Sequence, residues 1–112
     1  MKQPIRQARH QVTVNIGGQS YDLRASFGAL ADIEAALELE YLGEISARLA
    51  RPKIEELMIV FQLLVRAGGG DISEADMRDF SPLEISVMTQ AIAQAMEAGF
   101  GQNSKDAVKK KA

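Results

Sequence analysis

The chain has 112 residues, of which 46% are hydrophobic and 25% are charged, an ordinary size and composition for one globular domain. It contains no cysteine, which excludes disulfides, thiol nucleophiles and thiolate metal sites. The formal net charge of −2 is unevenly spread, with +3 on residues 1–16, −8 on residues 17–100 and +3 on residues 101–112.

The acidic central part argues against a surface for duplex DNA, which needs clustered lysine and arginine side chains. The longest strongly apolar stretch, residues 57–65, is interrupted by Gln62 and is far shorter than the about 20 residues of a membrane span. The basic N-terminus has no apolar segment behind it, so it is not a signal peptide. We therefore expect a soluble intracellular protein that does not interact with membranes.

Residues 1–10 are expected to be a flexible basic leader, and residues 11–25 to be a β-hairpin. Apolar residues alternate with polar ones on both sides of Gly17-Gly18, and such a glycine pair suits a turn that needs positive φ angles. A two-residue loop would pair Val14 with Tyr21, whereas a four-residue loop would pair Ile16 with Tyr21. Both loops match the apolar faces, so the sequence leaves the register open.

Helices are expected at about residues 26–40, 44–50, 53–67, 73–80 and 82–98. Ser26 can cap the first helix, and Ser81, Pro82 and Glu84 form the start signal and capping box of the last. Gly99 is the expected stop of that last helix, and residues 101–112 are small, polar and lysine-rich, as in a disordered tail. The predicted fold class is α+β and mostly helical: one domain over residues 11–100, with an N-terminal hairpin followed by a bundle of about four to five helices.

The helix predicted at residues 53–67 is apolar on nearly all sides, so it is either buried on most faces or carries a face that binds a partner. Methionines on the helical stripes either fill gaps in the core or form an adaptable binding surface. The residues that we assign to partner binding as a hypothesis are Met58, Ile59, Val60, Leu63, Met88 and Met96.

No catalytic, cofactor or metal site is expected. His10 is the only histidine, and residues 68–70 lack the lysine and hydroxyl residue that a phosphate loop requires. The acidic stretch that starts at Asp71 has Asp76 where a calcium loop of the EF-hand type needs glycine, and the acids of residues 32–40 lie off the apolar stripe of their helix. We therefore expect no enzymatic activity.

Residues 17–34, with the Leu23-Arg24 pair followed by Phe27-Gly28-Ala29-Leu30, resemble the signature of the small tail protein family of gene transfer agents and siphophages. Gly43, Arg48-Leu49 and residues 66–70 are similar to later blocks of that family, and the resemblance covers about residues 12–100. The family is grouped with tail assembly chaperones and is also described as a tail tube protein.

The resemblance implies a chaperone that binds the tape-measure protein, with tail tube subunits or a second copy of the chain as further partners, in the cytoplasm of a bacterial host. Phe27 and Leu30 would then lock the first helix to the core, while Ile59, Val60 and Leu63 would face a partner. The alternative is a structural tail tube or connector subunit of the particle. Tail tube subunits are typically β-rich, which favours the chaperone. A small DNA-binding regulator is a third hypothesis.

Overall fold

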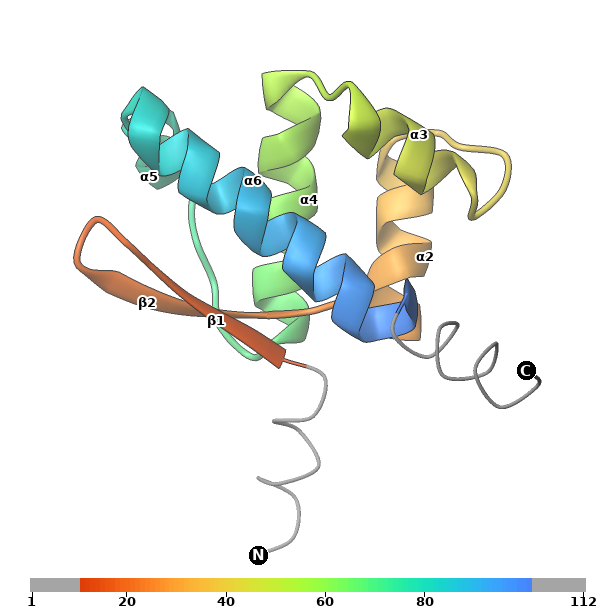
Figure 1. Ribbon diagram of the computed structural model, residues 1–112, viewed down its shortest axis with the longest axis horizontal. Coiled ribbons are helices and arrows are strands. Elements are labelled where there is room, and N and C mark those ends of the chain that lie inside the picture. The colour runs from red at the N-terminus through yellow and green to blue at the C-terminus, as the bar shows by residue number, and fades with distance from the viewer. Residues whose placement is uncertain (1–10, 102–112) are drawn as a thin grey trace, which may run out of the picture.

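The structure is a computed structural model that describes residues 11–101. Its elements, in chain order, are β1 (Gln11–Ile16), β2 (Gln19–Arg24), α2 (Phe27–Ala36), α3 (Glu44–Ala50), α4 (Ile54–Ala67), α5 (Glu74–Arg78), α6 (Pro82–Met96) and the π-helix η1 (Glu97–Gly101) (Figure 1). The predicted fold class, a hairpin followed by helices, is confirmed. The predicted leader with His10, and residues 102–112 of the predicted tail, lie outside the described residues, whereas Gly101 belongs to η1.

The hairpin closes through a two-residue turn, which decides between the two registers. Gly17 and Gly18 both have positive φ, 60° and 82°, as a type I′ turn requires. Val14 therefore pairs with Tyr21, and Val12 with Leu23. The side chains on the opposite face are polar, and Thr13, Asn15, Ser20 and Asp22 are exposed. Thr13 donates a hydrogen bond of 2.7 Å to Asp22 across the strands.

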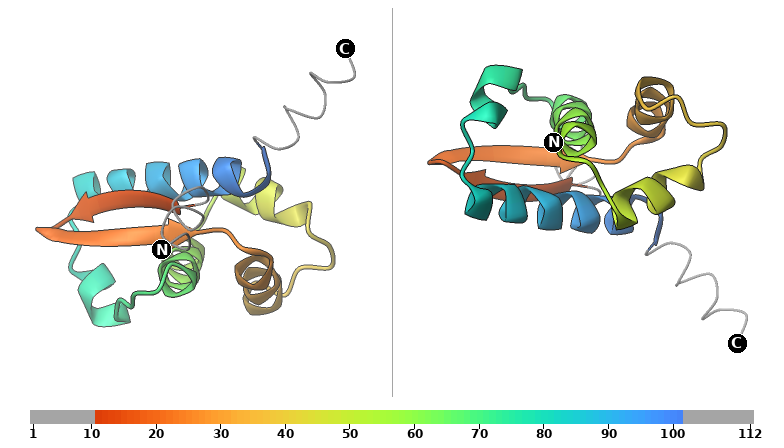
Figure 2. Two further views of the ribbon diagram at one scale, coloured as in Figure 1. Left: turned by 90° about the horizontal axis from the view of Figure 1, so that it is seen from below. Right: turned by 90° about the horizontal axis from the view of Figure 1, so that it is seen from above.

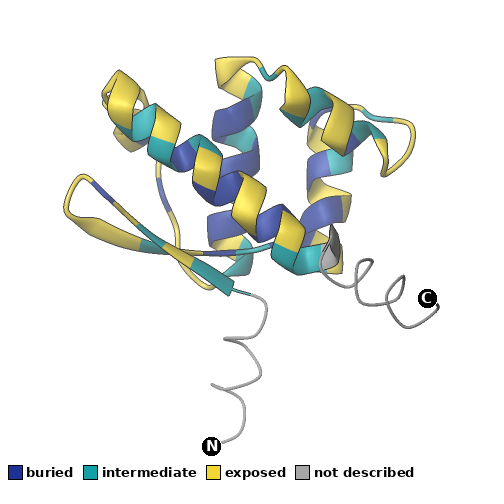
Figure 3. Cartoon of the chain, viewed as in Figure 1, coloured by how far each residue is buried: buried dark blue, intermediate teal, exposed yellow. Residues whose placement is uncertain are grey.

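The apolar face of the hairpin rests on two helices that come much later in the chain. α6 runs alongside the strands, while α4 stands nearly upright with its C-terminal end on them (Figures 1 and 2). Leu23 and Phe61 are completely buried where β2 meets α4, and the ring of Tyr21 packs edge-on against Phe61 with 5.7 Å between centroids. The buried residues of α2, α4 and α6 face one common core (Figure 3).

α2 begins as predicted but buries a different residue from the one expected. The Ser26 hydroxyl accepts a hydrogen bond from the amide of Ala29 and caps the helix. Leu30 is 5% exposed, in agreement with the expectation, but Phe27 is 87% exposed, so the prediction that it locks α2 to the core is wrong. Side chains tilt toward the N-terminus of a helix, and at its first residue Phe27 has no preceding turn to cover.

Two helices end in the same backbone motif with different residues at its critical position. At the end of α4, Gly69 has φ +100°, its amide bonds to the Arg66 carbonyl, and the amide of Gly70 bonds to Val65. At the end of α2 the amides of Glu38 and Leu39 bond in the same pattern to Ala35 and Glu34, and Glu38 has φ +56°. Both are Schellman motifs. α2 consequently ends at Ala36, before the predicted boundary near residue 40.

The end of α6 also differs from the prediction. The capping box of Ser81 and Glu84 is present, with Pro82 at the start. The helix does not stop at Gly99, because the chain continues from Met96 into η1, which contains Gly99. A Cβ atom on Gly99 would lie 2.8 Å from both the Cβ and the carbonyl oxygen of Ala25. Glycine therefore permits close packing here instead of ending the helix.

The tightest approach in the described part of the fold lies between α4 and β2. A Cβ atom on Gly68 would lie 2.1 Å from the backbone oxygen of Asp22 and 2.8 Å from its carbonyl carbon. The side-chain amide of Gln11 also donates a hydrogen bond of 3.4 Å to the Gly68 carbonyl. Gly68 itself has φ −81°, so the requirement for glycine here is the space between two backbones.

We predict that Gly68→Ala lowers the free energy of unfolding by about 3 kcal/mol or more, because the new methyl group meets backbone that cannot turn aside. The measurement is urea unfolding followed by circular dichroism. Gly28→Ala is the matched control. Gly28 lies in α2 with open space at its Cβ position, so this change should stabilise the protein by about 1 kcal/mol. Equal effects of the two substitutions would contradict the close-contact explanation.

We predict that Glu38→Gly stabilises the protein by about 1 kcal/mol, since an L-residue with a side chain pays roughly that much for the left-handed conformation. Thermal unfolding at neutral pH measures the change. Glu40→Gly, which does not relieve a positive φ angle, serves as the control and should give no stabilisation. A destabilised Glu38→Gly protein would show that the carboxylate contributes more than the backbone conformation costs.

Candidate functional site

The structure places most of the residues assigned to partner binding inside the protein. Val60 and Met88 are completely buried, and Met58 and Met96 are each 7% exposed. Ile59 and Leu63 are half-buried and pack against the edge of the core. α4 is apolar on several sides because the hairpin, α2 and α6 all contact it, so Val60 is not available to a partner in the folded chain.

A groove lies instead beside the N-terminal half of α4, between residues of α4, α5 and the start of α6; Figure 1 shows the arrangement of these helices. It consists of two hollows of about 240 Å³ and 420 Å³ that share Met58 and Met77. We call it the methionine groove and define it by its apolar lining residues Ile54, Met58, Ile59, Met77, Phe80, Pro82 and Ile85. Only Met58 and Ile59 coincide with the predicted partner-binding residues.

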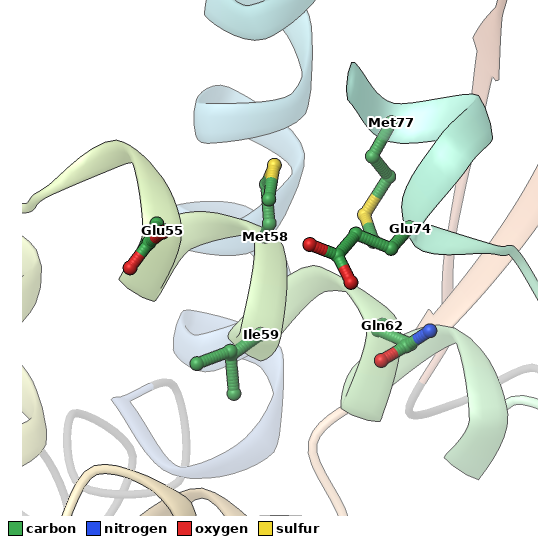
Figure 4. A pocket seen from close by; sticks show the side chains of 6 residues that line it. All are labelled: Glu55, Met58, Ile59, Gln62, Glu74 and Met77. Carbon is green, nitrogen blue, oxygen red and sulfur yellow. The ribbon is translucent and has the colours of Figure 1, made fainter. Parts of the chain in front are cut away.

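The floor of the methionine groove comes from two helices that face each other. In Figure 4 the side chains of Met58 on α4 and Met77 on α5 point into the space between these helices, together with the Glu74 carboxylate. Met58 and Met77 are 7% and 2% exposed, whereas Ile54 at the rim is 61% exposed. The groove therefore has a packed thioether floor and an open apolar rim.

Two carboxylates line the smaller hollow of the groove, and one basic group lines the larger one. Glu55 and Glu74 line the smaller hollow, with side chains 80% and 63% exposed. Arg78 pairs with Glu74 at 2.9 Å and approaches Glu55 at 4.0 Å, so the single cation that lines either hollow is already shared between two acids.

One hydrogen bond attaches the segment before α5, the helix that forms one wall of the groove, to α4. The side-chain amide of Gln62 on α4 donates a hydrogen bond of 2.8 Å to the carbonyl of Ile72, which is buried just before α5 begins. Ser73 then caps α5 by accepting from the amide of Asp76. The width of the methionine groove depends on this attachment, since α5 itself has only five residues.

A third hollow adjoins this region on the hairpin side, with Tyr21, Asp71, Asp76, Asp79 and Glu84 in its lining. Burial, and secondarily the negative charge of Asp76, raises the pKa of the Tyr21 phenol.

Among residues 11–101 no group of three or more histidine, cysteine or acidic side chains could hold a metal ion.

No helix in the described part of the chain is long and apolar enough to cross a membrane.

The methionine groove could not be predicted from the sequence, because its residues come from three helices. Ile54 and Ile85 occur on predicted helical stripes and Phe80 at a predicted helix end, so each was consistent with an ordinary core position. Ile54 is the first residue of α4 and stays exposed although it lines the same hollow as Met77 and Ile85.

We predict that Gln62→Leu lowers the free energy of unfolding by about 1 kcal/mol and speeds hydrogen exchange of the α5 amides, because the Ile72 carbonyl loses its donor. Hydrogen exchange followed by NMR measures both effects. Gln94→Leu is the matched control at an exposed position of α6. If α5 exchanged at the same rate in both variants, the hydrogen bond would not be what holds α5 in place.

Comparison with known protein families gives a match over most of the chain. Residues 9–102 match the family described as "Phage tail tube protein, GTA-gp10". No curated protein and no solved structure matches the chain.

Proposed function

The chain belongs to the GTA-gp10 family of phage tail tube proteins, and on that basis we propose that it is a structural component of a phage-type tail. The single observation that carries this proposal is the family match over residues 9–102, which includes every described strand and helix. It agrees with the structural alternative raised by the sequence. In this role the protein would be made in the cytoplasm of a bacterial host and retained in the particle.

The described surface supports a role based on contacts with other proteins. Among residues 11–101 no charged or polar residue is buried, and the methionine groove has an open apolar rim with Glu55, Glu74 and Arg78 beside it. Such surfaces are typical of protein–protein contact. We propose accordingly that the chain works by binding and has no enzymatic activity.

The second candidate function is a tail assembly chaperone that binds the tape-measure protein and leaves before the tail is complete. One observation favours it: residues 11–101 form two strands of six residues each, and most of the remainder is helical. A tube built by strand pairing needs more edge than a single short hairpin provides. The methionine groove would suit an apolar helical client.

Quantitative mass spectrometry of purified particles tests the structural role. We expect the chain to be present at many copies per tape-measure protein, as repeated rings of a tube require. The major capsid protein in the same sample provides the reference for stoichiometry. If deletion of the gene abolished tails while the chain was missing from wild-type particles, the structural role would be excluded and the chaperone role supported. In that case co-expression with the tape-measure protein should give a soluble complex.

A further inference from the structure

We propose that the methionine groove binds an amphipathic helix of a partner protein, with apolar residues on one face and basic residues beside them. This inference deepens the proposed function by naming a binding surface and the chemistry of its partner. It rests on the proposed function only in that both require a protein partner.

The shape and lining of the groove indicate a side chain-mediated contact. Two hollows share Met58 and Met77, and the larger one extends to Ile85 and Pro82. Methionine side chains adapt their rotamers to different apolar groups, which suits a floor that receives several side chains in a row. Ile54, Phe80 and Ile85 supply firmer apolar contacts around it.

The helices that line the groove favour a helical backbone in the partner segment that binds there. Met58, Met77 and Ile85 all project from helices, and the amides of Met77 and Ile85 donate to the Ser73 and Ser81 carbonyls at 3.2 Å and 2.9 Å. An extended segment laid in the groove would find no strand edge to satisfy its backbone. A helix satisfies its own backbone and presents only side chains, so it is the conformation that the groove accommodates at lowest cost.

The charges around the groove determine which charged residues the bound helix carries beside its apolar face. Glu55 on α4 and Glu74 on α5 are mostly exposed, and Arg78 is the one basic residue that lines either hollow. The acids Asp76, Asp79 and Glu84 line the adjoining hollow, which shares Phe80 with the larger hollow of the groove. Their field attracts lysine and arginine and repels an acidic helix.

The test measures binding of two labelled peptides to the purified full-length chain by fluorescence anisotropy. The peptides are amphipathic helices of about 18 residues, one of leucine and lysine and one of leucine and glutamate. We expect the lysine peptide to bind at least about tenfold more tightly than the glutamate peptide. Equal binding of the two peptides, or no binding of the lysine peptide, would overturn the proposal.

Variants then place the peptide on the molecule. Ile54→Ser should weaken binding of the lysine peptide by about tenfold, because an exposed isoleucine loses its apolar contact. Phe27→Ser removes a still more exposed apolar side chain from α2, outside the groove, and should leave binding unchanged. The double variant Glu55→Gln and Glu74→Gln should reduce the preference for the lysine peptide. If Phe27→Ser weakened binding as much as Ile54→Ser, the peptide would be held elsewhere and the proposal would fail.

Two other occupants of the groove, a second copy of the chain and the chain's own basic end, would each give a different result. Sedimentation of the full chain distinguishes a second copy: a dimer that Ile54→Ser dissociates would assign the groove to self-association and overturn the proposal. Replacement of Lys105, Lys109, Lys110 and Lys111 by glutamine distinguishes the chain's own basic end. Tighter peptide binding by that variant would make this end the occupant. Unchanged monomer mass and unchanged peptide affinity support a separate partner. None of these measurements uses particles, so their failure is distinguishable from failure of the tail role.

Discussion

The contact between the end of α4 and the backbone of β2 is the constraint on which the rest of the structure depends. Gly68 lets the helix approach the carbonyl of Asp22 more closely than any side chain would permit. This approach sets Phe61 under Tyr21 and against Leu23, and it leaves α6 to cover the other part of the hairpin's apolar face. A two-stranded hairpin is only marginally stable alone, so α4 and α6 make the strands possible as much as the strands complete the core.

Signals that act within a few residues could be predicted from the sequence. The glycine pair of the hairpin and the serine caps at Ser26 and Ser81 all depend on nearby backbone groups. The register was ambiguous only because both loop lengths conserve the alternation, and the φ angles of Gly17 and Gly18 resolve it. The early end of α2 at a left-handed glutamate had no signal, since glycine or asparagine is the usual residue there.

The position of a residue relative to the whole core could not be predicted from its own helix. The predictions for Val60 and Phe27 were wrong in opposite directions, because Val60 is buried and Phe27 is exposed. Val60 was placed on an outer face, yet α4 has neighbours on nearly every side and buries it, while Phe27 continues an apolar stripe into a turn that no other element covers. The methionine groove required three separate helices to be placed together, which periodicity within one segment cannot do. The family resemblance in the sequence, by contrast, is confirmed by the match over residues 9–102.

The contact between β1 and α6 has a consequence for folding during synthesis on the ribosome. The hairpin is the first described part to be made, yet one of the two helices that cover its apolar face is made last. At ordinary rates of translation the interval between Ile16 and Met96 lasts several seconds, far longer than a hairpin needs to form. Throughout that interval the part of the hairpin that α6 contacts lacks this helix. The polar outer face and the short strands then limit the chance that two nascent hairpins associate with each other before α6 emerges.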